Sequence, residues 1–216
     1  MTNFNIYLKK LNPLYYIGKT VNQIEETKMW MELESNGVDF IEQLGSDIRG
    51  HSKYQMTRPN HIRLVKEFLA RRDITSKDAI LDIGCGKGGM IYVFHCVGFV
   101  KADGIDYSEE LCLTACANME RLEINSHIKC ENAAEYEAYD DYNYIYMYNP
   151  FGEDIMRKVV FNIGCSLKRK PRKIRIIYAN PNYEYVLDEA GYILTDTLRS
   201  SILFPETVAV YNKESN

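Results

Sequence analysis

The chain has 216 residues and a formal net charge of −4, with 46% hydrophobic and 26% charged residues. These values are typical of a globular protein with one core. An acidic chain does not favour a nucleic-acid partner, because neutralising phosphates requires clustered basic residues. The basic run from Lys168 to Lys173 is the exception, and we expect it to form a solvated loop.

The cysteines and histidines indicate neither disulfides nor a metal site. The six cysteines include no CxxC pair, and the four histidines lack the spacing of zinc ligands. We expect no signal peptide at the start of the chain, and no stretch approaches the ~18 apolar residues of a membrane span. We therefore expect a cytoplasmic protein without a metal ion and without membrane association.

The N-terminal part differs from the rest of the chain. An apolar stripe at helical spacing runs from Val21 to Leu44 and is interrupted by Asn36-Gly37, which predicts two helices joined by a turn. We expect residues 1–58 to form a helical cap or lid with a linker, and residues 59–216 to form the main domain. A cap that packs on the domain and a lid over a substrate pocket are equal alternatives.

From residue 60 onward, helical and strand patterns alternate. We expect strands at 79–83, 101–105, 127–131, 142–148 and 174–179, and helices at 60–71, 88–98, 108–122, 153–167 and 184–190. Two closing strands, at 192–196 and 203–211, complete the pattern as a hairpin-like pair at one edge. The alternation predicts an α/β fold with a doubly wound, mostly parallel, seven-stranded sheet and an N-terminal helical appendage.

A glycine-rich turn follows the first predicted strand, with the pattern Asp82-x-Gly84-x-Gly86-x-Gly88, and Asp106 ends the second strand. Glycines let a backbone approach a ligand closely, and an acid at the next strand end can accept the hydroxyls of a ribose. A dinucleotide is one alternative, but Asp82 would be poorly placed beside a pyrophosphate. Its carboxylate suits a cationic group instead.

Residues 78–211, with this loop and Asp106, resemble the class I S-adenosylmethionine-dependent methyltransferases. The resemblance implies a Rossmann-like methyltransferase fold, S-adenosyl-L-methionine as the cofactor, and no need for a metal. It also implies cofactor-binding residues at the methionine, ribose and adenine parts of the site, namely Asp82, Gly84, Cys85, Gly86, Gly88, Asp106, Tyr107, Asn132 and Ala133. Asn132 stands where the family often has an acid. Surface packing is the alternative for Tyr107, and Cys85 is not expected to act as a nucleophile.

The fourth strand ends in Tyr148-Asn149-Pro150-Phe151, which is similar to a shortened (Asn/Asp/Ser)-Pro-Pro-(Tyr/Phe) motif of nitrogen-directed methyltransferases. That similarity implies that Asn149 positions the methyl acceptor, with the rings of Tyr148 and Phe151 shaping the site. The alternative is a turn in which Pro150 holds Asn149 in an extended conformation.

Residues 54–57, Tyr-Gln-Met-Thr, resemble the Tyr-x-x-Thr element of the non-SET histone-lysine methyltransferases and their bacterial relatives. The resemblance implies that Tyr54 and Thr57 lie over the methionine end of the cofactor. A capping role for Thr57 at the start of the next helix is the alternative.

We therefore expect a methyltransferase acting on an amine, including a protein lysine. A methyltransferase acting on a hydroxyl of a small molecule or glycan, and a non-catalytic module that binds the cofactor, are the alternatives. A nucleic-acid methyltransferase is favoured less. The sequence leaves open the acceptor, the oligomeric state and the role of residues 1–50.

Overall fold

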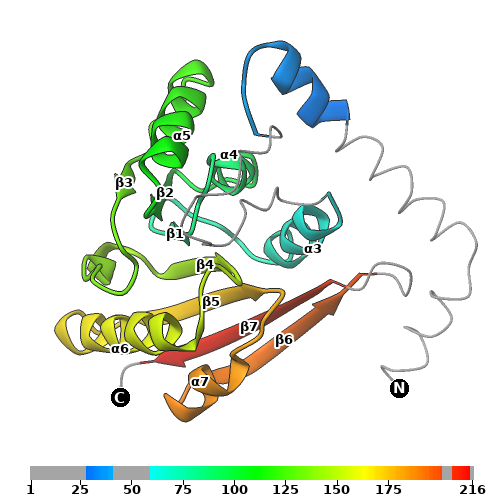
Figure 1. Cartoon of the computed structure of the whole chain (residues 1–216). Helices are drawn as coiled ribbons and strands as arrows, with labels where there is room; N and C mark the ends of the chain where they lie inside the picture. Colours follow the sequence, from blue (N-terminus) through cyan, green and yellow to red (C-terminus); the bar gives the residue numbers. More distant parts are fainter. Residues whose placement is uncertain (1–27, 41–58, 201–205, 215–216) are drawn as a thin grey trace, which may run out of the picture.

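The computed structural model describes residues 28–40, 59–200 and 206–214. Seven strands form one sheet in the order β3-β2-β1-β4-β5-β7-β6 (Figure 1). All neighbouring pairs are parallel except those made by β7, which runs antiparallel to both β5 and β6. The predicted α/β fold is confirmed. The strands are β1 Ala79–Ile83, β2 Lys101–Asp106, β3 Ile128–Cys130, β4 Tyr144–Tyr148, β5 Lys173–Ala179, β6 Ile193–Arg199 and β7 Thr207–Glu214.

Helices cover both faces of this sheet. One buried cluster joins the sheet to α3 and α4 and takes in Trp30, Val38 and Phe40 from the N-terminal segment. The other cluster joins the opposite face to α6 and α7. The helices are α3 Pro59–Leu69, α4 Gly89–Cys96, α5 Glu109–Arg121, α6 Glu153–Arg169 and α7 Glu184–Glu189, with a short 3-10 helix, η1, at Tyr139–Asp141.

The largest difference from the expected elements lies at the C-terminal end. The last strand is β7 at Thr207–Glu214 rather than 203–211, and β6 extends to Arg199. The predicted pairing of the two closing strands is confirmed, with β6 as the edge strand. The 3-10 helix η1 is not predicted by the sequence, because its single turn is too short to show helical periodicity.

The N-terminal segment packs onto α4 as a cap. Residues 28–35 are helical and a turn follows at 36–37, as the Asn36-Gly37 pair predicts. The ring of Trp30 lies 4.9 Å from that of Phe40 and 6.2 Å from that of Tyr92 on α4, both edge-on. Residues 38–40, which follow the turn, are not helical, and the rest of the second predicted helix lies outside the described residues. The proposed boundary near residue 58 also lies at the edge of the described residues, so the division into two domains stays a prediction.

No helix in these described ranges is both long enough and apolar enough to cross a membrane. The same ranges contain no cluster of three or more His, Cys, Asp or Glu side chains that could hold a metal ion. All six cysteines are free thiols.

Gly104, in the middle of β2, provides the first testable prediction. A Cβ there would lie 2.6 Å from Ile91 Cδ1 and 2.7 Å from Cys85 Sγ. We expect Gly104→Ala to lower the free energy of unfolding by about 1–3 kcal/mol, because a packed core resists an added methyl group. Urea unfolding followed by circular dichroism measures this change.

Gly164 on α6 is the matched control, because a Cβ there meets no atom within 4 Å. Replacing a glycine inside a helix with alanine is expected to stabilise by about 1 kcal/mol. Equal effects of Gly104→Ala and Gly164→Ala would contradict the packing role of Gly104.

Candidate functional site

The glycine loop leaves β1 at the carboxyl edge of the sheet and is tied to the end of β2. Gly84, Gly86 and Gly88 have φ values of 79°, 54° and 83°, a conformation that side chains with a Cβ rarely adopt. The backbone amides of Gly84 and Cys85 donate to the Ile105 carbonyl at 2.8 and 3.0 Å. The loop is therefore held from β2 and leads directly into α4.

Asp106 adds a side-chain connection between the same two elements. Its Oδ2 accepts from the Gly86 amide at 2.9 Å, and its Oδ1 accepts from the Ser108 amide at 3.0 Å. Burial raises the pKa of the Asp106 carboxyl, while the hydrogen bonds from the backbone oppose that rise. Each carboxylate oxygen keeps further acceptor capacity for a ligand.

Asp82 is a buried acid for which the described residues supply no counter-charge. The residue is 2% exposed, and its carboxyl group makes no hydrogen bond or ion pair with another side chain or backbone group in the described ranges. Burial, and then the charge of Asp106, raises the pKa of Asp82 well above its ordinary value. A carboxyl group under these conditions indicates a site for a cationic group, whose charge would favour the ionised form.

Cys85 is a buried residue of the glycine loop. Burial, and then the charges of Asp82 and Asp106, raises the pKa of the Cys85 thiol well above its ordinary value. A thiol in this environment stays protonated and is a weak nucleophile. The role of the Cys85 backbone and the absence of covalent chemistry at its thiol stay predictions.

The exit of β4 lies against the glycine loop. A Cβ on Gly84 would fall 2.7 Å from Pro150 Cβ, so only glycine allows this contact. Asn149 has a φ of 39°, in the left-handed region. The interpretation of Asn149 as an extended residue before a proline is therefore wrong, because the chain turns sharply there instead. Asparagine is among the residues that tolerate this conformation best.

Tyr178 on β5 fixes the side chain of Asn149, a role that the sequence analysis missed. The Tyr178 hydroxyl accepts from the amides of Asn182 and Tyr183 at 3.3 and 3.4 Å. It donates to Asn149 Oδ1 at 3.4 Å. Since the hydroxyl has one proton, the two incoming donors direct that proton to Asn149. Tyrosines in strands are common, so no local pattern distinguishes this one.

The two expected aromatic residues lie on opposite faces of the sheet. Tyr148 packs on the side of α3, where its ring meets that of His61 edge-on at 4.7 Å, and Phe151 packs on the side of α6. His61, which contacts Tyr148, also forms a buried hydrogen bond of 2.5 Å between its Nε2 and the Tyr146 hydroxyl. Burial lowers the pKa of His61 to about 3, so the ring is neutral.

The residues expected at the adenine end follow β2 and β3. Tyr107 comes directly after Asp106 and is 56% exposed. Asn132 Oδ1 accepts from the Ala134 amide at 3.0 Å, and Ala133 packs against the core on the α6 side. The expected residues at the ends of β1, β2 and β4 therefore lie close together. Tyr107, Asn132 and Ala133 lie farther along the same edge of the sheet. Tyr54 and Thr57 lie outside the described residues.

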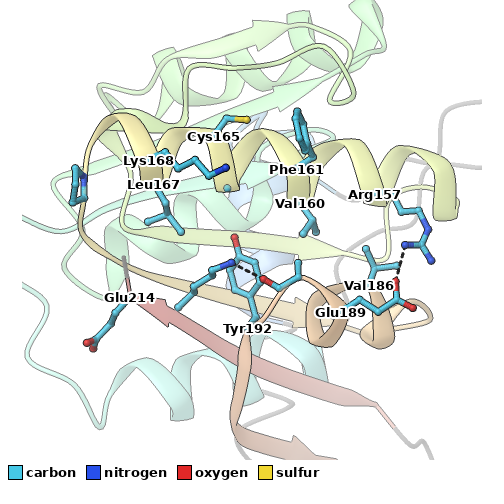
Figure 2. Close-up of a pocket in the computed structure, with 14 residues that line it drawn as sticks. Arg157, Val160, Phe161, Cys165, Leu167, Lys168, Val186, Glu189, Tyr192 and Glu214 are labelled. Carbon is cyan, nitrogen blue, oxygen red and sulfur yellow. Dashed lines mark hydrogen bonds and ion pairs between the residues drawn. The ribbon is translucent and has the colours of Figure 1, made fainter. Parts of the chain in front are cut away.

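A groove of about 760 Å³ lies elsewhere, between α6 and α7 (Figure 2). Its floor includes Val160, Leu167 and Tyr192, and Glu214 lies at its end. Glu214 pairs in the sheet with Lys173, the first residue of β5, so this end of the groove lies at the edge of the sheet opposite the glycine loop. The groove is therefore separate from the site described above.

Comparison with known proteins agrees with this geometry. Residues 80–169 match a family model described as a methyltransferase domain. No curated protein matches the sequence. Among solved structures, a TehB-like S-adenosylmethionine-dependent methyltransferase from Corynebacterium glutamicum is 16% identical, with a TM-score of 0.54, over 89% of this chain and 98% of that one.

Two further solved structures are similar over a shorter part of the chain. Magnesium protoporphyrin IX methyltransferase from Synechocystis, with S-adenosylmethionine bound, is 15% identical, with a TM-score of 0.53, over 71% of this chain and 78% of that one. Ribosomal protein L11 methylase from Lactobacillus delbrueckii is 14% identical, with a TM-score of 0.53, over 72% of this chain and 78% of that one.

Residues 80–169 therefore match a methyltransferase domain, and the chain shares the fold of a methyltransferase solved with S-adenosylmethionine bound. The buried Asp82 carboxyl fits this group, since the methionine end of the cofactor carries an ammonium. The solved structures differ in the substrates that their names state, so the fold leaves the acceptor open.

Asp82 provides a prediction that separates stability from binding. We expect Asp82→Asn to raise the free energy of unfolding at pH 7 by about 1–3 kcal/mol, since it removes a buried ionisable group, and to weaken cofactor binding. Because the pKa of the Asp82 carboxyl is raised in the folded state, the unfolded chain loses this proton at a lower pH than the folded chain does. The wild type is therefore penalised as the pH rises above the ordinary Asp pKa, and the gain of the variant should vanish below about pH 4.

Urea unfolding at several pH values and calorimetric titration of the cofactor measure both effects. Asp73→Asn, at an exposed position, is the control and should change stability by less than about 0.5 kcal/mol. A less stable Asp82→Asn variant at pH 7 would contradict the electrostatic account.

Asp106 provides a third prediction. We expect Asp106→Ala to weaken S-adenosylmethionine binding by more than about tenfold, because hydrogen bonds to a charged group contribute about 1.5–3 kcal/mol each. Glu110→Gln, an exposed neighbour on α5, should leave the affinity unchanged. Equal calorimetric affinities of Asp106→Ala and wild type would refute the assignment of Asp106 to this site.

Proposed function

We propose that this protein transfers a methyl group from S-adenosylmethionine to an amine, with protein lysine as one candidate acceptor. The observation that carries the proposal is the sharp turn of Asn149-Pro150-Phe151 against the glycine loop, where Gly84 and Pro150 are in contact. This turn brings an amide oxygen to the exit of β4, beside the residues proposed to hold the cofactor.

The proposed roles at the cofactor site follow from the chemistry of each side chain. Asp82 would pair with the ammonium of the methionine part, and the backbone of the glycine loop would line that part. Asp106 would accept from the ribose hydroxyls, while Tyr107 and the Asn132-Ala133 stretch would lie at the adenine. S-adenosylmethionine, when bound, supplies an activated methyl group whose sulfur leaves as a neutral thioether.

Asn149 would position the acceptor. Tyr178 occupies one lone pair of Asn149 Oδ1, and the second lone pair can accept an N–H from the amine. This fixes the direction of the nitrogen lone pair during attack, and such orientation can supply about 7–11 kcal/mol of the barrier. Tyr148 and Phe151 would enclose the turn from the two faces of the sheet.

An amine fits this site better than a hydroxyl does. A hydroxyl is a weak nucleophile until a base removes its proton, whereas an amine that has lost its extra proton to solvent attacks through its nitrogen lone pair. The histidine that packs against Tyr148 is His61, and burial lowers its pKa to about 3, which makes it a poor base near neutral pH.

The basic run supports an acceptor other than nucleic acid. Arg169 pairs with Asp140, Lys170 with Asp141 and Lys173 with Glu214. These ion pairs neutralise part of the positive charge of the basic run, which leaves less positive potential for binding phosphates.

The free cysteines support a reducing compartment, such as the cytoplasm. Cys85 and Cys112 are buried, where a thiol packs as a small apolar group.

Asn149→Ala tests the proposal. We expect the variant to lower turnover by more than about tenfold while the cofactor affinity changes by less than about twofold, because only the orientation of the acceptor is lost. Mass spectrometry of methyl transfer to paired acceptors, which carry an amine or a hydroxyl on the same scaffold, measures turnover.

Transfer to hydroxyls alone would contradict the proposed amine acceptor. Cofactor binding by the wild type without transfer to any acceptor would instead favour a binding module. Equal loss of turnover and affinity in Asn149→Ala would remove its special role.

A further inference from the structure

A buried ion pair connects the glycine loop to the N-terminal segment. Lys87 lies between Gly86 and Gly88, and its side chain is fully buried. Its Nζ donates to Asp39 Oδ2 at 2.6 Å, while the Asp39 side chain is 33% exposed. The helix of residues 28–35, which precedes Asp39, lies beside α4 in Figure 1, and Trp30 packs over Gly89. A charge within the cofactor loop is thus compensated by a residue from outside the segment that matches the methyltransferase family.

Asn118 on α5 holds both partners in place. Its Oδ1 accepts from the Asp39 amide at 2.9 Å, and its Nδ2 donates to the Asp39 carbonyl at 2.8 Å. The same Nδ2 donates to the Lys87 carbonyl at 2.9 Å. The Asn118 carboxamide therefore fixes the backbone of both Asp39 and Lys87, which gives the ion pair a defined position relative to the glycine loop.

The position of this pair matters because the two forms of the cofactor differ in charge. S-adenosylmethionine carries an ammonium, a carboxylate and a sulfonium, and so has a net positive charge. S-adenosylhomocysteine, the product, lacks the sulfonium and is neutral overall. A positive potential in the loop disfavours the methyl donor relative to the product, and charges act over longer distances in a poorly solvated interior.

We propose that Asp39 is a specificity-determining residue of the cofactor site: by compensating Lys87, it lets the glycine loop bind the positively charged methyl donor in the presence of the neutral product. The proposal rests on binding of S-adenosylmethionine at the glycine loop. It gives the N-terminal segment a role in the choice of ligand, beyond its packing on α4.

The test is the ratio of two dissociation constants, Kd of S-adenosylmethionine over Kd of S-adenosylhomocysteine, measured by calorimetry at low ionic strength. We expect Asp39→Asn to raise this ratio by about three- to tenfold, since Lys87 is then less compensated. Lys87→Met should lower the ratio, and the double variant should return it toward the wild-type value.

Asn118→Ala is the matched control, since it loosens the same segment without changing a charge. We expect it to weaken both ligands by the same factor and to leave the ratio unchanged. An unchanged ratio in folded Asp39→Asn would overturn the proposal and would leave the pair with a purely structural role.

If circular dichroism shows that Asp39→Asn does not fold, Lys87→Met and the double variant decide. An unchanged ratio in Lys87→Met would then overturn the proposal. Failure of the wild type to bind either ligand would instead refute the cofactor assignment, so the two failures are distinguishable.

Discussion

The carboxylate of Asp106 is the contact on which the rest of the site depends. It joins the end of β2 to the Gly86 amide, and the Ile105 carbonyl beside it accepts from two further loop amides. These bonds hold the loop in a conformation that glycine adopts without a steric penalty. With the loop held in this way, Gly84 meets Pro150, and the exit of β4 is placed against the loop. The residues at the carboxyl end of β2 thus fix the positions of the ends of β1 and β4.

The acids and the base around this loop form one electrostatic unit. Asp82 and Asp106 are both buried, and each has a raised pKa in the protein without ligand. Two buried acids favour a positively charged ligand, whereas Lys87 in the same loop opposes one. The site therefore depends on how completely Lys87 is compensated from the N-terminal segment. Burial of the Asp82 carboxyl lowers the free energy of unfolding, as is common where ligand binding requires an unfavourable environment for a side chain.

The features that the sequence analysis predicted correctly are those that repeat or are stereochemically unusual. The alternation of strands and helices predicted the sheet, and the glycines after β1 predicted the loop, because few residues other than glycine adopt its backbone conformation. Contacts between distant segments could not be predicted. Nothing near Tyr178 indicates that its proton goes to Asn149, and nothing near Asp39 indicates that it meets Lys87, forty-eight positions away. Such pairs depend on tertiary packing, which a single sequence does not encode locally.

The two edges of the sheet have a consequence for how this protein meets other chains. An open edge presents unpaired backbone groups that can recruit a strand from a neighbour. Here one edge is β3, which has three residues. The other is β6, whose register shifts between Leu194 and Asp196, and whose Asp196 pairs with Arg72. A short edge and an irregular, charged edge both disfavour growth of the sheet by strand addition. A protein partner or a second copy would therefore be expected to dock on helices and loops, and the sheet would not be extended by a strand from another chain.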